Sequence, residues 1–352
     1  MMQTNFIIYG ANGYTGALVA RLAAGRGLRP TLAGRSAAEV GRLAGELGLE
    51  HKVFDLADAA AVDAALEGSA AVLHCAGPFS RTSKPMADAC LRTRTHYLDI
   101  TGEIAVFEGL AARDAEAKSA GVMLLPGVGF DVVPSDCLAA HLKRRLPEAV
   151  HLTLAIKGSG RLSRGTATTM TENISRGGLV RRGGKLTPVP AAWHTREIDF
   201  GKGPEPATTI PWGDVSTAFH STGIADVEVY AAMPSSMRWA MVVSRHVGGL
   251  LASPWAQRYM KSRIRSGPPG PSDEERARGR SIVWGEATDA AGNRRVSRLR
   301  GPEGYTLTAM TALAAVGRVL AGNAPAGFQT PSRAYGADFI MEIEGVTRED
   351  LE

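Results

Sequence analysis

The sequence contains little cysteine, few aromatic side chains and only a small excess of positive charge. Three cysteines in 352 residues are too few and too scattered for a disulfide framework or a CxxC metal site, so we expect a protein of the reducing cytoplasm. Lys and Arg number 40 against 35 Asp and Glu, a net charge of +5. The basic stretch 157–185 has no aromatic residue and the stretch 258–280 has only Tyr259. Nucleic-acid sites interleave basic and aromatic residues, so we expect no nucleic-acid partner.

The best candidate for a membrane segment, residues 236–255, is interrupted by charge. Arg238 and Arg245 are costly at a bilayer centre, so the segment is not expected to span a membrane. It is predicted to form a core or interface helix. Peripheral membrane contact is the alternative, because Trp239, Trp255 and the flanking arginines are typical of an interfacial helix. Residues 1–9 contain no basic residue and are predicted to form a first strand rather than a secretory signal.

Several catalytic patterns are absent. None of the seven tyrosines is followed by lysine four residues later, which excludes the mechanism of short-chain dehydrogenases. No GxSxG or HExxH motif occurs, and the eight histidines show no metal-ligand spacing with the cysteines. We therefore expect neither a nucleophilic serine nor a bound metal.

Apolar runs and helical patterns alternate over the first third of the chain. The predicted strands are 6–9, 30–33, 52–55, 70–75, 96–100 and 122–125, and the predicted helices are 14–26, 37–47, 59–66, 84–91 and 104–119. Such alternation favours an α/β domain, a doubly wound parallel sheet of the Rossmann type, over residues 1–126.

The pattern changes after residue 126. Strands are predicted at 151–157, 225–232, 281–288 and 294–299, the last two joined by a hairpin turn at 290–293, and helices at 166–174 and 306–321. These elements favour a C-terminal α+β domain with a largely antiparallel sheet over residues 127–352. Its last part, about residues 302–352, could pack back on the Rossmann domain.

The segment between the first strand and the first helix has three glycines at GxxGxxG spacing. Gly10 permits a tight turn, Gly13 lets the backbone approach a pyrophosphate, and Gly16 lets the helix pack closely on the sheet. The helix N-terminus supplies N–H groups for the phosphates. A dinucleotide site is predicted; a purely structural turn is the alternative. The second strand ends in Arg35 and Ser36 rather than an acid, which suits the 2′-phosphate of NADP better than NAD; an exposed arginine at a helix start is the alternative.

The predicted cofactor-binding residues lie after four successive strands. They are Gly10, Asn12, Gly13, Tyr14, Thr15, Gly16, Arg35, Ser36, Asp55, Cys75, Ala76, Gly77 and Pro78. Asp55 is expected near the adenine, or else solvated at the surface, and Cys75–Pro78 beside the nicotinamide ribose.

In a reaction of a nicotinamide cofactor the cofactor supplies the hydride, so the protein would need mainly to orient the substrate and to supply one proton donor at most. Asp131, Tyr97 and Asp99 are the catalytic candidates, with Asp131 preferred, because burial can raise a carboxyl pKa toward neutrality. Glu103 and Asp136 are weaker candidates. Tyr97 could instead be only a packing residue of its strand, and Asp136 could place its negative charge in the first turn of a helix.

The chain resembles the saccharopine dehydrogenase-like NAD(P)-dependent oxidoreductases, a family that includes trans-acting enoyl reductase-like members. The matching segments are GANGYTG (10–16), AGRS (33–36), CAGPFS (75–80), HYLDITGE (96–103), PGVGFDVVPSD (126–136), GPEGYTLTA (301–309) and GFQTPSRAYG (327–336). The resemblance implies a Rossmann domain followed by an α+β domain that holds the substrate, usually in a homodimer. It does not imply that saccharopine is the substrate.

These observations predict an NADP-dependent oxidoreductase. Its reaction would be reduction by NADPH of a C=C, C=N or C=O bond in a small or lipid-like substrate. The alternative is a non-catalytic NADP-binding protein with a regulatory or redox-sensing role.

Overall fold

The computed structural model describes residues 5–158, 161–173 and 177–352, and the chain divides into two compact units. The first comprises Met1–Val133 and Tyr305–Gly336, and the second comprises Pro134–Gly304 and Ala337–Glu352. The predicted boundary, residue 126, falls shortly before the first division. Of the predicted returning part, 302–352, the first unit takes Tyr305–Gly336.

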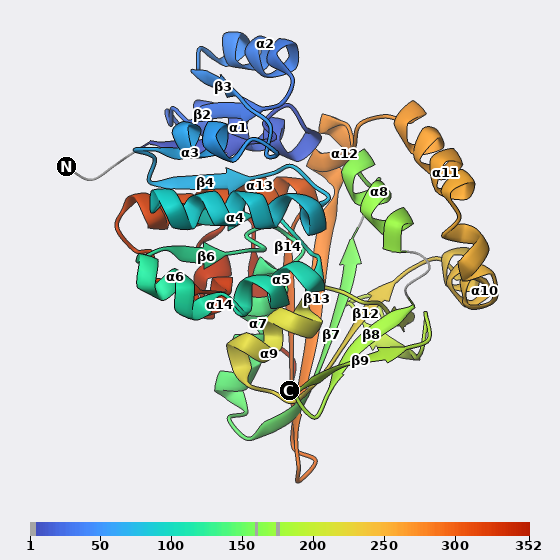
Figure 1. Cartoon of the computed structure of the whole chain (residues 1–352). Coiled ribbons are helices and arrows are strands. Elements are labelled where there is room, and N and C mark those ends of the chain that lie inside the picture. Colours follow the sequence, from blue (N-terminus) through green and yellow to red (C-terminus); the bar gives the residue numbers. More distant parts are fainter. Residues whose placement is uncertain (1–4, 159–160, 174–176) are drawn as a thin grey trace. The chain divides into compact units, whose positions relative to one another are not determined.

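The first unit is built on a seven-stranded sheet in which the paired strands run parallel (Figure 1). Its strands are β1 (Phe6–Tyr9), β2 (Thr31–Gly34), β3 (His51–Val53), β4 (Ala71–His74), β5 (His96–Asp99), β6 (Met123–Leu125) and β15 (Gly327–Phe328). The order β15-β6-β5-β4-β1-β2-β3 places β1 beside β4, where the direction of winding reverses. Ligands of such sheets bind beyond the carboxyl ends of the strands at this point. The predicted Rossmann fold is confirmed.

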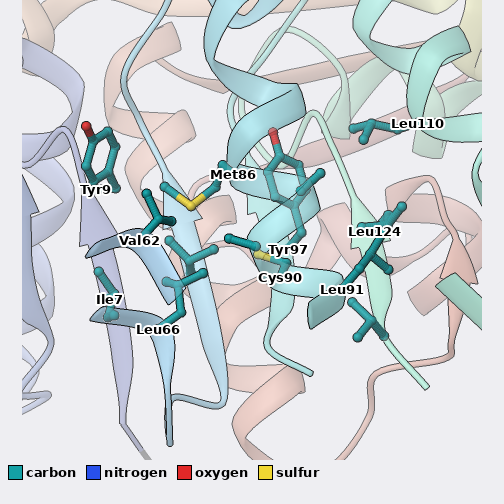
Figure 2. Close-up of a cluster of buried hydrophobic side chains, with 14 of the residues drawn as sticks. Ile7, Tyr9, Val62, Leu66, Met86, Cys90, Leu91, Tyr97, Leu110 and Leu124 are labelled. Atoms are coloured by element: carbon teal, nitrogen blue, oxygen red, sulfur yellow. The ribbon is translucent and has the colours of Figure 1, made fainter. Parts of the chain in front are cut away.

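Helices connect these parallel strands, and a short helix follows the last of them. They are α1 (Tyr14–Gly25), α2 (Ala37–Leu47), α3 (Ala59–Leu66), α4 (Phe79–Thr93), α5 (Ile104–Ala111), α6 (Asp114–Ala120), α13 (Gly304–Leu320) and α14 (Pro331–Tyr335). The four residues of β1 are all buried, as expected for a strand covered on both faces. Figure 2 shows the core on one face, where Ile7 and Tyr97 of the sheet pack with Leu66 of α3 and Met86 of α4.

Two predicted helices of this unit were wrong in their extent. The predicted helix 104–119 is divided into α5 and α6, and the aspartate that begins α6, Asp114, accepts a hydrogen bond from the backbone N–H of Phe328 at 2.9 Å. The predicted helix 84–91 begins earlier, at Phe79, because a carboxylate from another loop binds its first N–H groups.

The second unit contains a nine-stranded, largely antiparallel sheet. Its strands are β7 (Ala149–Gly158), β8 (Gly178–Arg182), β9 (Lys185–Val189), β10 (Thr195–Asp199), β11 (Pro204–Thr209), β12 (Asp226–Ala232), β13 (Arg280–Asp289), β14 (Arg294–Pro302) and β16 (Thr347–Asp350). The main order is β10-β11-β12-β7-β13-β14-β16, with β8 paired to β12 and β9, and only β12–β7 is parallel among the described pairs. The predicted α+β architecture and the β13–β14 hairpin are confirmed.

The helices of the second unit lie before or between these strands in the chain. They are α7 (Val133–Arg145, which begins one residue before the division), α8 (Arg164–Asn173), α9 (Asp214–Thr222), α10 (Ser235–Leu251), α11 (Pro254–Ser266) and α12 (Asp273–Arg278), with a short 3₁₀ turn at Phe339–Glu342. The predicted helix 166–174 corresponds to α8, and its residue 174 lies outside the described residues.

Candidate cofactor and active site

The glycine turn after β1 lies directly against the loop after β4. Gly10 has φ +79°, and a Cβ at this position would lie 2.8 Å from both the N and the Cβ of Ala76. The N–H groups of Gly10 and Ala11 both donate to the carbonyl of Ala33, at 2.8 and 3.1 Å. A side chain at residue 10 would therefore separate β1 from the β4 loop, which explains the glycine in physical terms.

The other two glycines bring the start of α1 onto this turn. A Cβ at Gly16 would lie 2.3 Å from the carbonyl oxygen of Gly10, and one at Gly13 would lie 3.2 Å from the same atom. Within the described part of the chain, no side chain caps the N-terminus of α1, and its first turn has no acidic residue. The turn thus presents a backbone cradle at the positive end of a helix dipole, the arrangement that binds phosphate.

The end of β2 supplies positive charge beside this cradle. Arg35 is exposed, and Ser36 begins α2 as its N-cap, with its Oγ accepting from the N–H of Glu39 at 3.4 Å. The side-chain amide of Asn12 donates to Oε2 of Glu39 at 2.6 Å and so ties the glycine turn to α2. The Ser36 hydroxyl hydrogen is not used by that cap.

The charge of Arg35 and that of Asp55 both act on one buried hydroxyl. Burial raises the pKa of Tyr9 to about 12; Asp55 adds to this rise and Arg35 opposes it. Asp55, at the end of β3, is exposed, and its Oδ1 accepts from the N–H of Ala57 at 2.9 Å. Arg35 and Asp55 also follow the neighbouring parallel strands β2 and β3, so these predicted adenosine-side residues lie at the same carboxyl end of the sheet. A glycine cradle with an arginine and no acid at the end of β2 fits NADP.

The segment Cys75–Pro78 follows β4 and lies at the same carboxyl end of the sheet. The N–H of Cys75 donates to the carbonyl of Tyr9 at 2.7 Å, and the hydroxyl of Thr82 donates to the carbonyl of Ala76 at 2.7 Å. Cys75 is half-buried, and burial together with the Asp99 carboxylate raises the pKa of its thiol. The Cys75 thiol is thus neutral rather than a nucleophilic thiolate.

Tyr97 and Asp99, two of the predicted catalytic residues, form a buried pair at the end of β5. Both residues are fully buried, and the Tyr97 hydroxyl donates to Oδ2 of Asp99 at 2.5 Å. Oδ1 of Asp99 accepts from the N–H groups of Thr101 and Gly127, each at 2.9 Å. This carboxylate therefore joins the loops after β5 and β6. Burial raises the pKa of Asp99 to about 6, although these hydrogen bonds oppose the shift. The geometry favours a positioning role for the pair.

Asp131, the preferred proton donor, lies in the loop after β6 and is only half-buried. A Cβ at Gly102 would lie 2.9 Å from its Oδ2, so the loop after β5 passes directly against this carboxyl group. The neighbouring N–H of Phe130 donates to Oγ1 of Thr308 in α13 at 2.9 Å. Burial of the carboxyl raises the pKa of Asp131 to about 6. Asp131 therefore combines a raised carboxyl pKa with partial exposure of the residue to solvent.

Glu103 has a role that the sequence pattern did not reveal. Its two carboxylate oxygens accept from the N–H groups of Phe79 and Ser80, at 2.7 and 3.0 Å, and so cap α4 from the loop after β5. Asp136, the other weak candidate, is buried in the first turn of α7 and accepts a hydrogen bond from Ser221. Nothing in either sequence segment indicated these partners, since both contacts join residues distant in the chain.

Two aromatic side chains of this unit have contacts that were not predicted, although Tyr14 itself was a predicted cofactor-binding residue. Tyr14, at the start of α1, makes an edge-to-face contact with Tyr305 of α13, with ring centroids 5.1 Å apart. His74, at the end of β4, is fully buried near Tyr9 and Phe79, and burial lowers its pKa to about 3. It is a neutral core residue. The motif GPEGYTLTA at 301–309 was the sequence signal for the α13 contacts.

Among the described residues, no group of three His, Cys, Asp or Glu side chains is placed to hold a metal ion. In the same residues, no helix is both long enough and apolar enough to cross a membrane.

The fold and the glycine turn define a dinucleotide-binding domain. Residues 6–125 match the family model described as the saccharopine dehydrogenase NADP binding domain. The predicted resemblance is thereby confirmed over residues 6–125, which are similar to the NADP-binding domain of saccharopine dehydrogenases.

Curated relatives from several Mycobacterium species carry the name trans-acting enoyl reductase. The protein from Mycobacterium leprae is 32% identical over 154 residues and that from Mycobacterium ulcerans 30% identical over 154 residues. Each alignment covers 42% of this chain and 37% of the relative, so the chain matches less than half the length of these proteins. Saccharopine dehydrogenase (L-Glu forming) from Saccharomyces cerevisiae has a similar fold, with a TM-score of 0.68, 12% identity and coverage of 99% of this chain and 100% of that one.

Proposed function

We propose that this protein is an NADPH-dependent reductase that acts on a small or lipid-like substrate. The observation that carries the proposal is the backbone cradle at the N-terminus of α1 with Arg35 at the end of the neighbouring strand. When bound there, NADPH would supply a hydride. The names of these curated relatives favour a C=C bond as the acceptor over C=N or C=O.

Each loop at the carboxyl end of the parallel sheet has a separate role in this proposal. The N–H groups of the glycine turn and the dipole of α1 bind the pyrophosphate. Arg35 and the Ser36 hydroxyl bind the 2′-phosphate, and Asp55 lies toward the adenosine. Segment 75–78 offers small residues beside the nicotinamide ribose. Tyr97 and Asp99 hold the loops after β5 and β6 in register.

We assign the proton to Asp131. A carboxyl whose pKa is about 6 is partly protonated near neutral pH and can donate to a substrate carbon or heteroatom that gains negative charge. The variant Asp131→Asn keeps the size of the side chain and removes this proton. It should lose turnover while its NADPH affinity stays within about twofold of the wild type. Unchanged turnover would remove Asp131 from the mechanism.

The cofactor assignment is tested by the variant Arg35→Ala. A charge-assisted hydrogen bond contributes about 1.5–3 kcal/mol, so the dissociation constant for NADPH should rise about tenfold to a hundredfold, with little change for NADH. Arg42→Ala is the matched control, since Arg42 is an exposed arginine of α2 that pairs with Glu46 at 2.6 Å. Calorimetric titration of both nucleotides measures the effect. Equal losses for NADPH and NADH in Arg35→Ala would contradict the assignment.

The reductase and the non-catalytic alternative are separated by turnover. Stopped-flow measurement of NADPH oxidation against a panel of enoyl, imino and keto compounds should show substrate-dependent oxidation, fastest with an enoyl compound. Tight NADPH binding without oxidation across the panel would instead support a regulatory or redox-sensing protein.

A further inference from the structure

The most exposed apolar side chains of the described residues gather on two consecutive helices of the second unit, α10 and α11. Trp239 is 68% exposed, Tyr259 64%, Trp255 58% and Leu250 56%, and no other large apolar side chain of the described residues reaches these values. Only single scattered apolar residues are ordinarily exposed on a soluble protein. This concentration therefore indicates a surface with a partner.

The exposed side chains of α10 lie on one side of the helix. Trp239, Val243 and Leu250 are spaced by four and seven residues, which places them within about 40° of one another around the helix axis. On α11, Trp255 and Tyr259 are four residues apart and also share one side. We call these five residues the aromatic face.

Polar contacts fix both helices to the rest of the second unit. The guanidinium of Arg245 donates to the carbonyls of Ala191 and Ala192, each at 2.7 Å. The side-chain amide of Gln257 donates to the carbonyl of Thr171 in α8 at 3.0 Å, and Lys261 pairs with Glu172 of α8 at 2.6 Å. The aromatic face is thus held outward by contacts on other sides of the helices. Figure 1 shows α11 following α10 in the chain, and α11 packs against α8.

The charge on this pair of helices has one sign. Residues 235–266 contain six Lys and Arg and no Asp or Glu. Arg245 and Lys261 are used in the anchoring contacts. For the remaining four, Arg238, Arg258, Arg263 and Arg265, the described part of the chain provides no carboxylate partner. The pair therefore presents aromatic rings together with uncompensated positive charge.

We infer that α10 and α11 form a docking surface for an anionic lipid membrane. Tryptophan and tyrosine side chains lie favourably at the boundary between headgroups and acyl chains, and arginines bind anionic headgroups. A symmetric contact with a second copy would place this surface on itself and bring the unpaired arginines together. Anionic lipid, in contrast, supplies the missing negative charge. The surface would bring the protein to a membrane by contacts independent of the cofactor residues.

Vesicle flotation of the full chain tests this inference. The probes are vesicles of phosphatidylcholine alone and of phosphatidylcholine mixed with phosphatidylglycerol. The wild type should float with the mixed vesicles, fail to float with phosphatidylcholine alone, and be released by high salt. The double variant Trp239→Ser/Trp255→Ser and the double variant Arg258→Gln/Arg263→Gln should each bind the mixed vesicles at least about tenfold more weakly.

The matched control is Val53→Ser, which removes a 45% exposed apolar side chain from β3 in the first unit and should leave flotation unchanged. Unchanged circular dichroism and NADPH titration in all variants show that they are folded, and these readings do not depend on membrane binding. Failure of the wild type to float with the mixed vesicles would overturn the inference. So would a dimer, measured by light scattering, that the tryptophan double variant converts to a monomer, because the aromatic face would then be an interface between two copies.

Discussion

A single methyl group added at Gly16 separates the role of the glycine turn in stability from its role in binding. The Cβ of alanine would lie 2.3 Å from the carbonyl oxygen of Gly10 and 3.0 Å from the Cα of Ala11. Both neighbours are backbone atoms of the turn, and that turn is held to β2 by the hydrogen bonds of Gly10 and Ala11 to Ala33. The new methyl group therefore has no flexible side chain to displace, and the turn and the helix must separate by roughly 1 Å.

The size of the effect follows from two opposing contributions. Overpacking of this kind costs about 1–3 kcal/mol. Alanine in a helix is about 1 kcal/mol more favourable than glycine. Gly25→Ala, in the last turn of the same helix, provides the second contribution alone, because a Cβ there meets no atom within 4 Å. The free energy of unfolding of Gly16→Ala should therefore lie about 1–3 kcal/mol below that of Gly25→Ala.

The assay combines urea unfolding with NADPH titration for the two variants. Because the displaced turn carries the N–H groups proposed to bind the pyrophosphate, Gly16→Ala should also bind NADPH at least about tenfold more weakly, whereas Gly25→Ala should bind as the wild type does. Equal stability of the two variants would refute the packing argument. A loss of stability in Gly16→Ala with unchanged NADPH affinity would show that the turn is only structural.

Two further predictions concern carboxylates at the same edge. Glu103→Gln removes the negative charge at the N-terminus of α4 while keeping one acceptor oxygen, so urea unfolding should show a loss of about 1 kcal/mol; an unchanged midpoint would contradict the capping role. The pKa of Asp131 is about 6 in the folded protein against an ordinary value of 3.8 for aspartate, so the folded state holds this proton more tightly than the unfolded chain does. The contribution of Asp131 to stability is therefore highest below about pH 4, falls as the pH rises to about 6 and is constant above. Asp131→Asn should remove this fall, and urea midpoints that decline as steeply as in the wild type between about pH 4 and 6 would contradict it.

Local patterns were sufficient to predict most of the first unit. The apolar run Phe6–Tyr9 is buried throughout, and the glycine turn stands between a strand and a helix, as its spacing indicates. Ser36, of a residue type that favours the N-cap position, accepts the hydrogen bond of an N-cap at the start of α2. These features depend on residues close together in the chain, so a short segment of sequence is sufficient to predict each of them.

The remaining features depend on contacts between distant residues. β15 has only two residues, Gly327 and Phe328, and exists because the N–H of Gly327 donates to the carbonyl of Val122 beside β6. No periodicity can be detected in two residues. The strands β8 to β11 are likewise short and were not predicted, and their pairing partners lie in separate segments. Among the site residues, the partners of Asp99 and Glu103 belong to other loops, so their roles were not visible in sequence.

These partners also decide which carboxyl can act as an acid. Asp99 and Glu103 each accept hydrogen bonds from two N–H groups, and such bonds favour the ionised carboxylate. For Asp99 burial outweighs them, but this side chain is fully buried and hydrogen-bonded to Tyr97, so a proton on it has no exposed route to a substrate. Asp131 is the carboxyl of the three that combines a pKa raised by burial with a residue that is partly exposed.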